Sequence, residues 1–125
     1  MMKFNNCIRP ILFVSSLLLY STTSFAANLP IKVDAKGDEL RAGNVAFPIW
    51  RYTITSLDDN ITLQSLVLNR NNCLISTNDR GQNTNAKLKF GQSYTFTSPS
   101  NSSYTQCKPL ELIVNTDKGS YTFTW

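Results

Sequence analysis

The cysteines are the side chains of this chain that are best suited to covalent chemistry. The 125 residues contain three cysteines and no histidine. Cys7 lies in an N-terminal segment that is predicted to be removed on export, which leaves Cys73 and Cys107. Two cysteines without a histidine make a poor zinc site, whereas an even pair in an exported chain is typical of a disulfide. We therefore predict a disulfide between Cys73 and Cys107 and no metal site.

Groups that could act as a general base are few. Histidine, the usual base near neutral pH, is absent, which removes the familiar catalytic triads. The chain has two pairs of adjacent acidic residues. Asp58-Asp59 lies in a predicted turn and Asp38-Glu39 precedes a Gly-Asn turn, so both pairs are expected to be solvated. The five glycines are isolated and form no phosphate-binding loop. We predict no catalytic residues, no cofactor and no enzymatic activity.

The N-terminus has the pattern of a secretory signal. A basic start with Lys3 and Arg9 precedes a short run, residues 11–20, that is apolar except for two serines. This run is shorter than the roughly 20 residues of a membrane-spanning helix. Ser24-Phe25-Ala26 then offers small residues to a signal peptidase. Residues 1–26 are predicted to be a signal peptide, cleaved there or one residue later, and residues 27–125 a single exported domain, periplasmic or secreted, without membrane insertion.

The predicted mature part carries little net charge. The full chain has 12 basic and 8 acidic residues, and removal of Lys3 and Arg9 leaves ten against eight, a net charge of +2. The remaining basic residues are scattered among acidic and polar ones. Nucleic-acid binding favours a denser basic stripe. We therefore predict no nucleic-acid partner.

Alternation of apolar and polar residues dominates residues 27–125, and no stretch has the apolar spacing of a buried helix face. In residues 47–57, for example, Trp50, Tyr52 and Ile54 fall on one side of a strand. Six further short strands are predicted at residues 31–33, at 61–68, from Cys73 onward, at 94–96, at 110–114 and at 121–125. Seven short strands in a chain of this length predict an all-β fold, a seven-stranded antiparallel β-sandwich of the immunoglobulin or fibronectin type III kind.

The sequence allows two alternative conformations for one segment of this sandwich. Residues 88–96 are either a tyrosine corner, in which the Tyr94 hydroxyl donates a hydrogen bond to the corner backbone, or a plain hairpin with a buried tyrosine.

The exposed aromatic residues of a binding protein are candidate interface anchors. The candidates here are Trp50, Tyr52, Tyr121 and Trp125, and the alternative is that they fill the core.

Four segments spread over most of residues 27–125 carry a family resemblance. They are GDELRAGNVAFPIWRY at residues 37–52, NRNNC at 69–73, LKFG at 88–91 and TDKGSYTFTW at 116–125. In these segments the chain resembles the IrmA family, small secreted bacterial proteins named as interleukin receptor mimics. The resemblance implies a fibronectin type III-like fold, a homodimer formed by exchange of strands, and binding of host cytokines. A strand exchange would need a hinge, expected in the polar segments 78–85 or 99–106.

Three functions compete on this evidence. The favoured one is a secreted binding module that acts on host proteins, as a virulence factor would. The second is a minor pilus subunit or adhesin-like component, which would carry an N-terminal donor strand, whereas residues 27–33 are few and include Pro30. The third is an inhibitor or glycan-binding domain, which would use exposed aromatic residues such as Trp50 or Trp125.

Reduction of the disulfide is expected to destabilise the protein. Closing a loop of about 35 residues stabilises a fold by roughly 3 to 4 kcal/mol in the chain-entropy treatment. The melting temperature of the purified exported protein should therefore fall by several degrees or more on reduction, as followed by circular dichroism. An unchanged melting temperature would show that the bond is absent or does not stabilise the fold.

Overall fold

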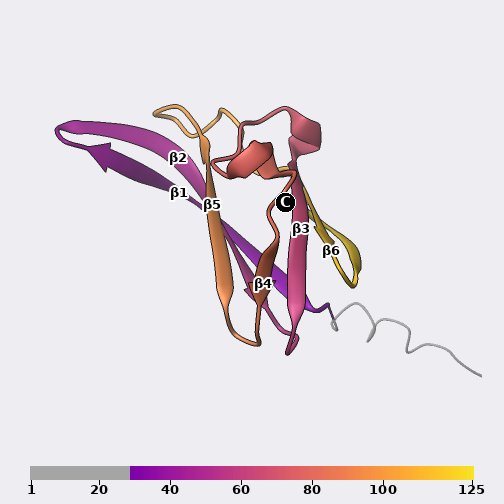
Figure 1. The fold of residues 1–125 in the computed structure, drawn as a ribbon. Coiled ribbons are helices and arrows are strands. Elements are labelled where there is room, and N and C mark those ends of the chain that lie inside the picture. The colour runs from indigo at the N-terminus through magenta and orange to yellow at the C-terminus, as the bar shows by residue number, and fades with distance from the viewer. Residues whose placement is uncertain (1–28) are drawn as a thin grey trace, which may run out of the picture.

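The computed structural model describes residues 29–125, in which seven strands form two sheets (Figure 1). The predicted signal peptide lies outside the described residues. The strands are β1 (Ile31–Ala42), β2 (Val45–Ser56), β3 (Ile61–Leu68), β4 (Ala86–Leu88), β5 (Ser93–Pro99), β6 (Glu111–Thr116) and β7 (Gly119–Thr124). Two short 3-10 turns, η2 (Asn69–Asn71) and η3 (Asn78–Gly81), lie between β3 and β4. The helices of residues 29–125 lack the length and apolar character that spanning a bilayer requires.

The two sheets form an antiparallel sandwich. One sheet has the strand order β1-β2-β5 and the other β4-β3-β6-β7. The inward residues are the apolar members of each alternating strand, which is why the sequence pattern locates the core. The fully enclosed residues are Ile31, Tyr52, Ile54, Ile61, Leu63, Leu66, Leu68, Leu112 and Val114. The predicted all-β sandwich with a disulfide between Cys73 and Cys107 is confirmed.

Four predicted strands agree closely with the structure. The prediction at residues 61–68 matches β3, and residues 47–57 fall almost wholly in β2. The C-terminal hairpin is also confirmed. Thr116 pairs with Gly119 across a turn of two residues, and the Asp117 carboxylate accepts a hydrogen bond from the Thr62 backbone N–H at 2.9 Å. This contact fixes the hairpin turn to β3, its neighbour in the sheet.

The strand predicted to begin at Cys73 is not present. Asn69, Arg70 and Asn71 have φ angles of 46°, 57° and 66°, a left-handed turn that takes the chain out of the sheet after β3. Cys73 then follows in a loop whose position the disulfide fixes. The fourth strand is instead the short β4, at residues 86–88. It lies between the polar segment 78–85 and the strand predicted at 94–96.

The first strand is far longer than predicted. β1 runs over 12 residues and pairs with β2 along its whole length, up to the turn at Gly43-Asn44. Asp38 and Glu39, predicted to be solvated turn residues, therefore lie within a strand. Aspartate and glycine have low strand propensity, but continuous pairing with the β-rich β2 outweighs it because propensity in sheets depends on context.

Neither prediction for residues 88–96 is correct. β4 and β5 belong to different sheets, so the segment between them crosses from one sheet to the other and is not a hairpin. The corner is closed by backbone bonds to Ser56, which donates to Gln92 O and accepts from Gly91 N, each at 2.9 Å. Within residues 29–125 the Tyr94 hydroxyl makes no hydrogen bond to the corner backbone. Its partial burial raises the pKa of Tyr94.

Candidate interaction surface on the β1–β2 hairpin

The β1–β2 hairpin extends beyond the sandwich. β1 and β2 pair over 12 positions each, whereas β5 pairs only with the part of β2 from Ile49 to Thr55. Residues 39–48, which we call the arm, are therefore a ribbon of two strands without a third. Figure 1 shows the arm projecting away from the two sheets.

The arm has one apolar face and one charged face. Leu40 pairs with Phe47 and Ala42 with Val45, and residues paired directly across two strands project to the same side. These four residues form what we call the arm face, in which Leu40, Val45 and Phe47 are 43%, 52% and 49% exposed. On the other side the Arg41 guanidinium lies 3.5 Å from the Glu39 carboxylate. Contiguous exposed apolar side chains are typical of a binding surface.

The arm face continues into a groove on the body of the protein. This apolar groove has a volume of about 380 Å³ and is lined by both halves of the hairpin, by the loop after Cys73 and by the end of β5. Its apolar lining residues include Leu40, Phe47, Ile49, Leu74, Ile75 and Pro99. The loop is fixed to β5 because Ser76 N donates to Thr97 O at 3.0 Å and Thr97 N donates to Ser76 Oγ at 2.9 Å.

A tyrosine on the opposite side holds the base of the arm. The Tyr104 hydroxyl donates to Asp38 O at 3.0 Å, and its ring meets the Trp50 ring edge-on with centroids 5.9 Å apart. A Cβ at Gly37 would lie 2.9 Å from the Tyr104 ring, so a side chain at this position would displace the tyrosine. The arm therefore leaves the body at an angle that Tyr104 restrains.

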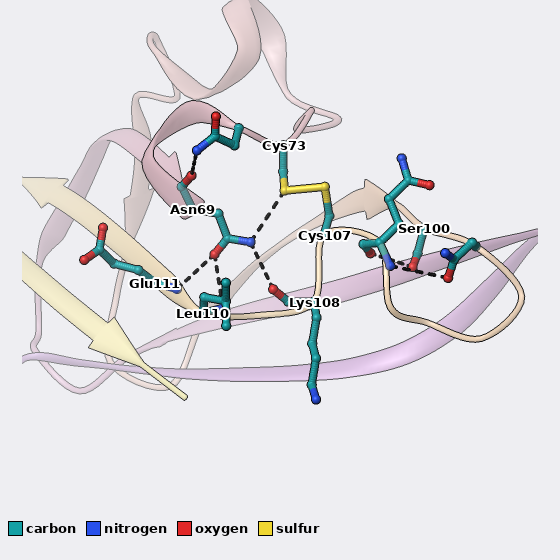
Figure 2. The surroundings of a disulfide bond; sticks show 10 residues. Asn69, Cys73, Ser100, Cys107, Lys108, Leu110 and Glu111 are labelled. Carbon is teal, nitrogen blue, oxygen red and sulfur yellow. Dashed lines mark hydrogen bonds between the residues drawn. A yellow bond between two sulfur atoms is a disulfide. The ribbon is translucent and has the colours of Figure 1, made fainter.

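The loop that carries Tyr104 is anchored at the disulfide, and Asn69 connects this anchor to the sheet (Figure 2). The Asn69 side-chain N–H donates to Lys108 O at 2.9 Å and to Cys73 Sγ at 3.5 Å. Its carbonyl oxygen accepts from the backbone N–H groups of Leu110 and Glu111 at 3.1 and 2.9 Å. One amide thus joins the end of β3, the disulfide and the start of β6.

The aromatic residues predicted as interface anchors lie mainly against the core. Tyr52 is fully buried and stacks on Phe96 with ring centroids 4.9 Å apart, and burial raises the pKa of Tyr52. It is therefore not available on this surface, and for Tyr52 the prediction is corrected in favour of core packing. Trp50 and Tyr121 are half-buried against the core, and Trp125 is 50% exposed.

The sequence reasoning missed the residues of the arm face. A signal was present, because the two-residue turn at Gly43-Asn44 sets Leu40 opposite Phe47 once β1 is extended. Only the short strand at residues 31–33 was predicted, so these residues were never placed opposite one another.

The candidate acid–base pairs serve as structural contacts. The Asp38 carboxylate lies 2.9 Å from Arg51 Nε, and the Asp58 carboxylate lies 3.0 Å from Lys118 Nζ. Residues 29–125 contain no group of three or more potential ligands, from histidine, cysteine, aspartate or glutamate, that could hold a metal ion. The arm face and the apolar groove are surface features that suit recognition of a partner.

No family model, no curated protein and no solved structure matches this chain.

Replacing Asn69 should destabilise the fold strongly. Asn69→Ala removes three bonds to backbone groups and leaves the partners of the amide unpaired, so the free energy of unfolding should fall by about 2 to 4 kcal/mol in urea denaturation. Asn71→Ala is the matched control, because Asn71 has a similar left-handed φ of 66° but no side-chain hydrogen bond among the described residues. Equal losses in the two variants would contradict the structural role of the Asn69 amide.

Acid should weaken the base of the arm. The Asp38 carboxylate accepts bonds from Glu39 N at 2.8 Å and from Arg51 Nε at 2.9 Å, which lower its pKa from the ordinary value of 3.8. Since this pKa is lower in the folded than in the unfolded chain, the ionised group stabilises the fold above the ordinary value, and that stabilisation is lost as pH falls through the folded pKa.

The melting temperature of Asp38→Asn should consequently depend less on pH than that of the parent protein below about pH 5. Asp34→Asn is the control, since Asp34 lies on the same strand and makes no ion pair among the described residues. Parallel melting curves for the parent and Asp38→Asn across this acid range would refute the assignment.

Proposed function

We propose that the exported domain is a protein-binding module that holds its partner on the arm face and in the apolar groove. The observation that carries the proposal is the exposure of Leu40, Val45 and Phe47 on one side of a projecting ribbon. A ribbon of two strands is marginally stable in water. A partner that covers the arm face would remove its apolar side chains from water and gain affinity from their burial.

The partner is proposed to be a host cytokine, because the segments quoted above resemble the IrmA family. That resemblance also supports a homodimer, formed by strand exchange, and a role in virulence outside the bacterial cell. The pilus-subunit alternative is less well supported, since β6 is already paired with β7 and leaves no place beside it for a donor strand.

Binding of the purified, oxidised protein to a panel of immobilised cytokines would test the proposal. Light scattering on the same sample would give the oligomeric state. Saturable binding by at least one cytokine is expected. Binding by none of them, together with a monomeric protein, would reject the cytokine and dimer proposals and favour the pilus or glycan alternatives.

The arm face should contain the residues that contribute most to binding. For a cytokine that binds in the panel, Phe47→Ser is expected to weaken the affinity by about tenfold or more, because central aromatic residues contribute most of the binding free energy of an interface. Phe90→Ser is the matched control. Phe90 is 65% exposed but precedes β5, at the opposite end of that strand from the groove. Equal affinity of the two variants, with unchanged melting temperatures, would place the interface elsewhere.

A further inference from the structure

A second, polar pocket adjoins the apolar groove. It has a volume of about 310 Å³ and is lined by Asn71, Asn72, Cys73, Leu74, Arg80 and Gln82. Leu74 lines both the pocket and the groove and is 56% exposed between them. A partner seated in the groove would therefore reach the polar pocket by passing over Leu74.

Arg80 is an unpaired cation at this pocket. Four ion pairs occur within residues 29–125, and their cations are Arg41, Arg51, Arg70 and Lys118. The nearest acidic residue in sequence, Asp79, accepts a 2.7 Å hydrogen bond from Asn83 instead. The Arg80 guanidinium thus has no carboxylate partner in the described part of the chain.

The turn that presents Arg80 is fixed by its packing. Asp79 and Arg80 have φ angles of 51° and 54°, a left-handed conformation that is costly for residues other than glycine. Gly81 follows with a φ of 89°, and a Cβ there would lie 2.8 Å from Leu66 O, so the turn packs directly on β3. The backbone of a cation held on such a turn loses little conformational freedom when the cation binds.

The pocket has the chemistry of a carboxylate site. A guanidinium binds a carboxylate through two parallel N–H···O bonds, which gives direction as well as attraction. The side-chain amides of Asn71 and Gln82 make no hydrogen bonds among the described residues and could donate to the same group. No aromatic ring lines the pocket, so the stacking that sugar binding commonly uses is not offered here.

We propose, building on the proposed protein-binding function, that Arg80 binds an acidic side chain of the partner. The partner would then present an aspartate or glutamate next to the apolar residues that enter the groove. Apolar contact would supply most of the affinity, and the Arg80 pair would select for the acidic partner.

A pair of capped dipeptides tests the pocket without a known partner. Acetyl-Leu-Glu-amide and acetyl-Leu-Gln-amide have nearly the same shape, and they differ in whether the side chain ends in a carboxylate or a neutral amide. Binding at millimolar concentrations is followed by NMR through the Arg80 side-chain N–H and the Gln82 amide. The acidic peptide should shift these signals saturably, and the neutral peptide should not. The shift of the Gln82 amide, which both variants retain, should vanish in Arg80→Gln and persist in Arg70→Gln, whose parent arginine also lies in a left-handed turn. Equal responses to both peptides, no response, or a response that persists in Arg80→Gln would overturn the proposal.

A cytokine that binds in the panel provides the second test. Arg80→Gln should weaken its binding by about tenfold at low ionic strength and less at high salt, while Arg70→Gln should have little effect. If Phe47→Ser weakens binding but Arg80→Gln does not, the protein-binding function stands and the role of Arg80 is rejected. If no cytokine binds, the cytokine proposal fails and the peptide experiment alone decides the carboxylate site.

Discussion

The architecture depends on a mismatch in length between β2 and its neighbour β5. β2 is paired with β1 over its whole length, so its backbone groups are satisfied on that side throughout. On the other side β5 covers only the part from Ile49 to Thr55. The longer part of β2, from Ile49 onward, therefore lies in the sandwich, and the shorter part before it projects. Strand alternation then has two outcomes, since Tyr52 points into the sandwich while Phe47, on the other side of the same strand, lies on the arm face.

The loops at one end of the sandwich are connected to one another beside the arm. The disulfide and Asn69 connect the end of β3 to the loop that precedes β6, and that loop carries Tyr104, which contacts the base of the arm. The same β3–β4 connection supplies Leu74 to the groove and Arg80 to the polar pocket. Segments distant in sequence thus meet at one surface, and each is held by hydrogen bonds or by the disulfide.

In the proposed binding function, recognition of the partner would depend on two kinds of contact. Burial of exposed Leu40, Val45 and Phe47 would be non-directional and would supply affinity in proportion to area. A charged pair at Arg80 would add direction and discriminate against partners that lack a carboxylate. The Arg80 turn packs on β3 before any partner binds, so little of its backbone would need ordering on binding.

The sequence by itself determined the fold class, the disulfide and most of the core. Alternation with period two shows which side of each strand is apolar, and once Cys7 is assigned to the predicted signal peptide, the two remaining cysteines have one possible pairing. It placed β3 and the C-terminal hairpin well for the same reason. Only the tertiary structure decided the length of β1, the loss of a strand at Cys73 and the burial of Tyr52. These depend on which strands pair and for how far, and on left-handed backbone angles at Asn69, Arg70 and Asn71. Local residue pattern could not reveal the pocket of Arg80, and for the arm face it gave only the turn at Gly43-Asn44, which places Leu40 opposite Phe47 once the full length of β1 is known.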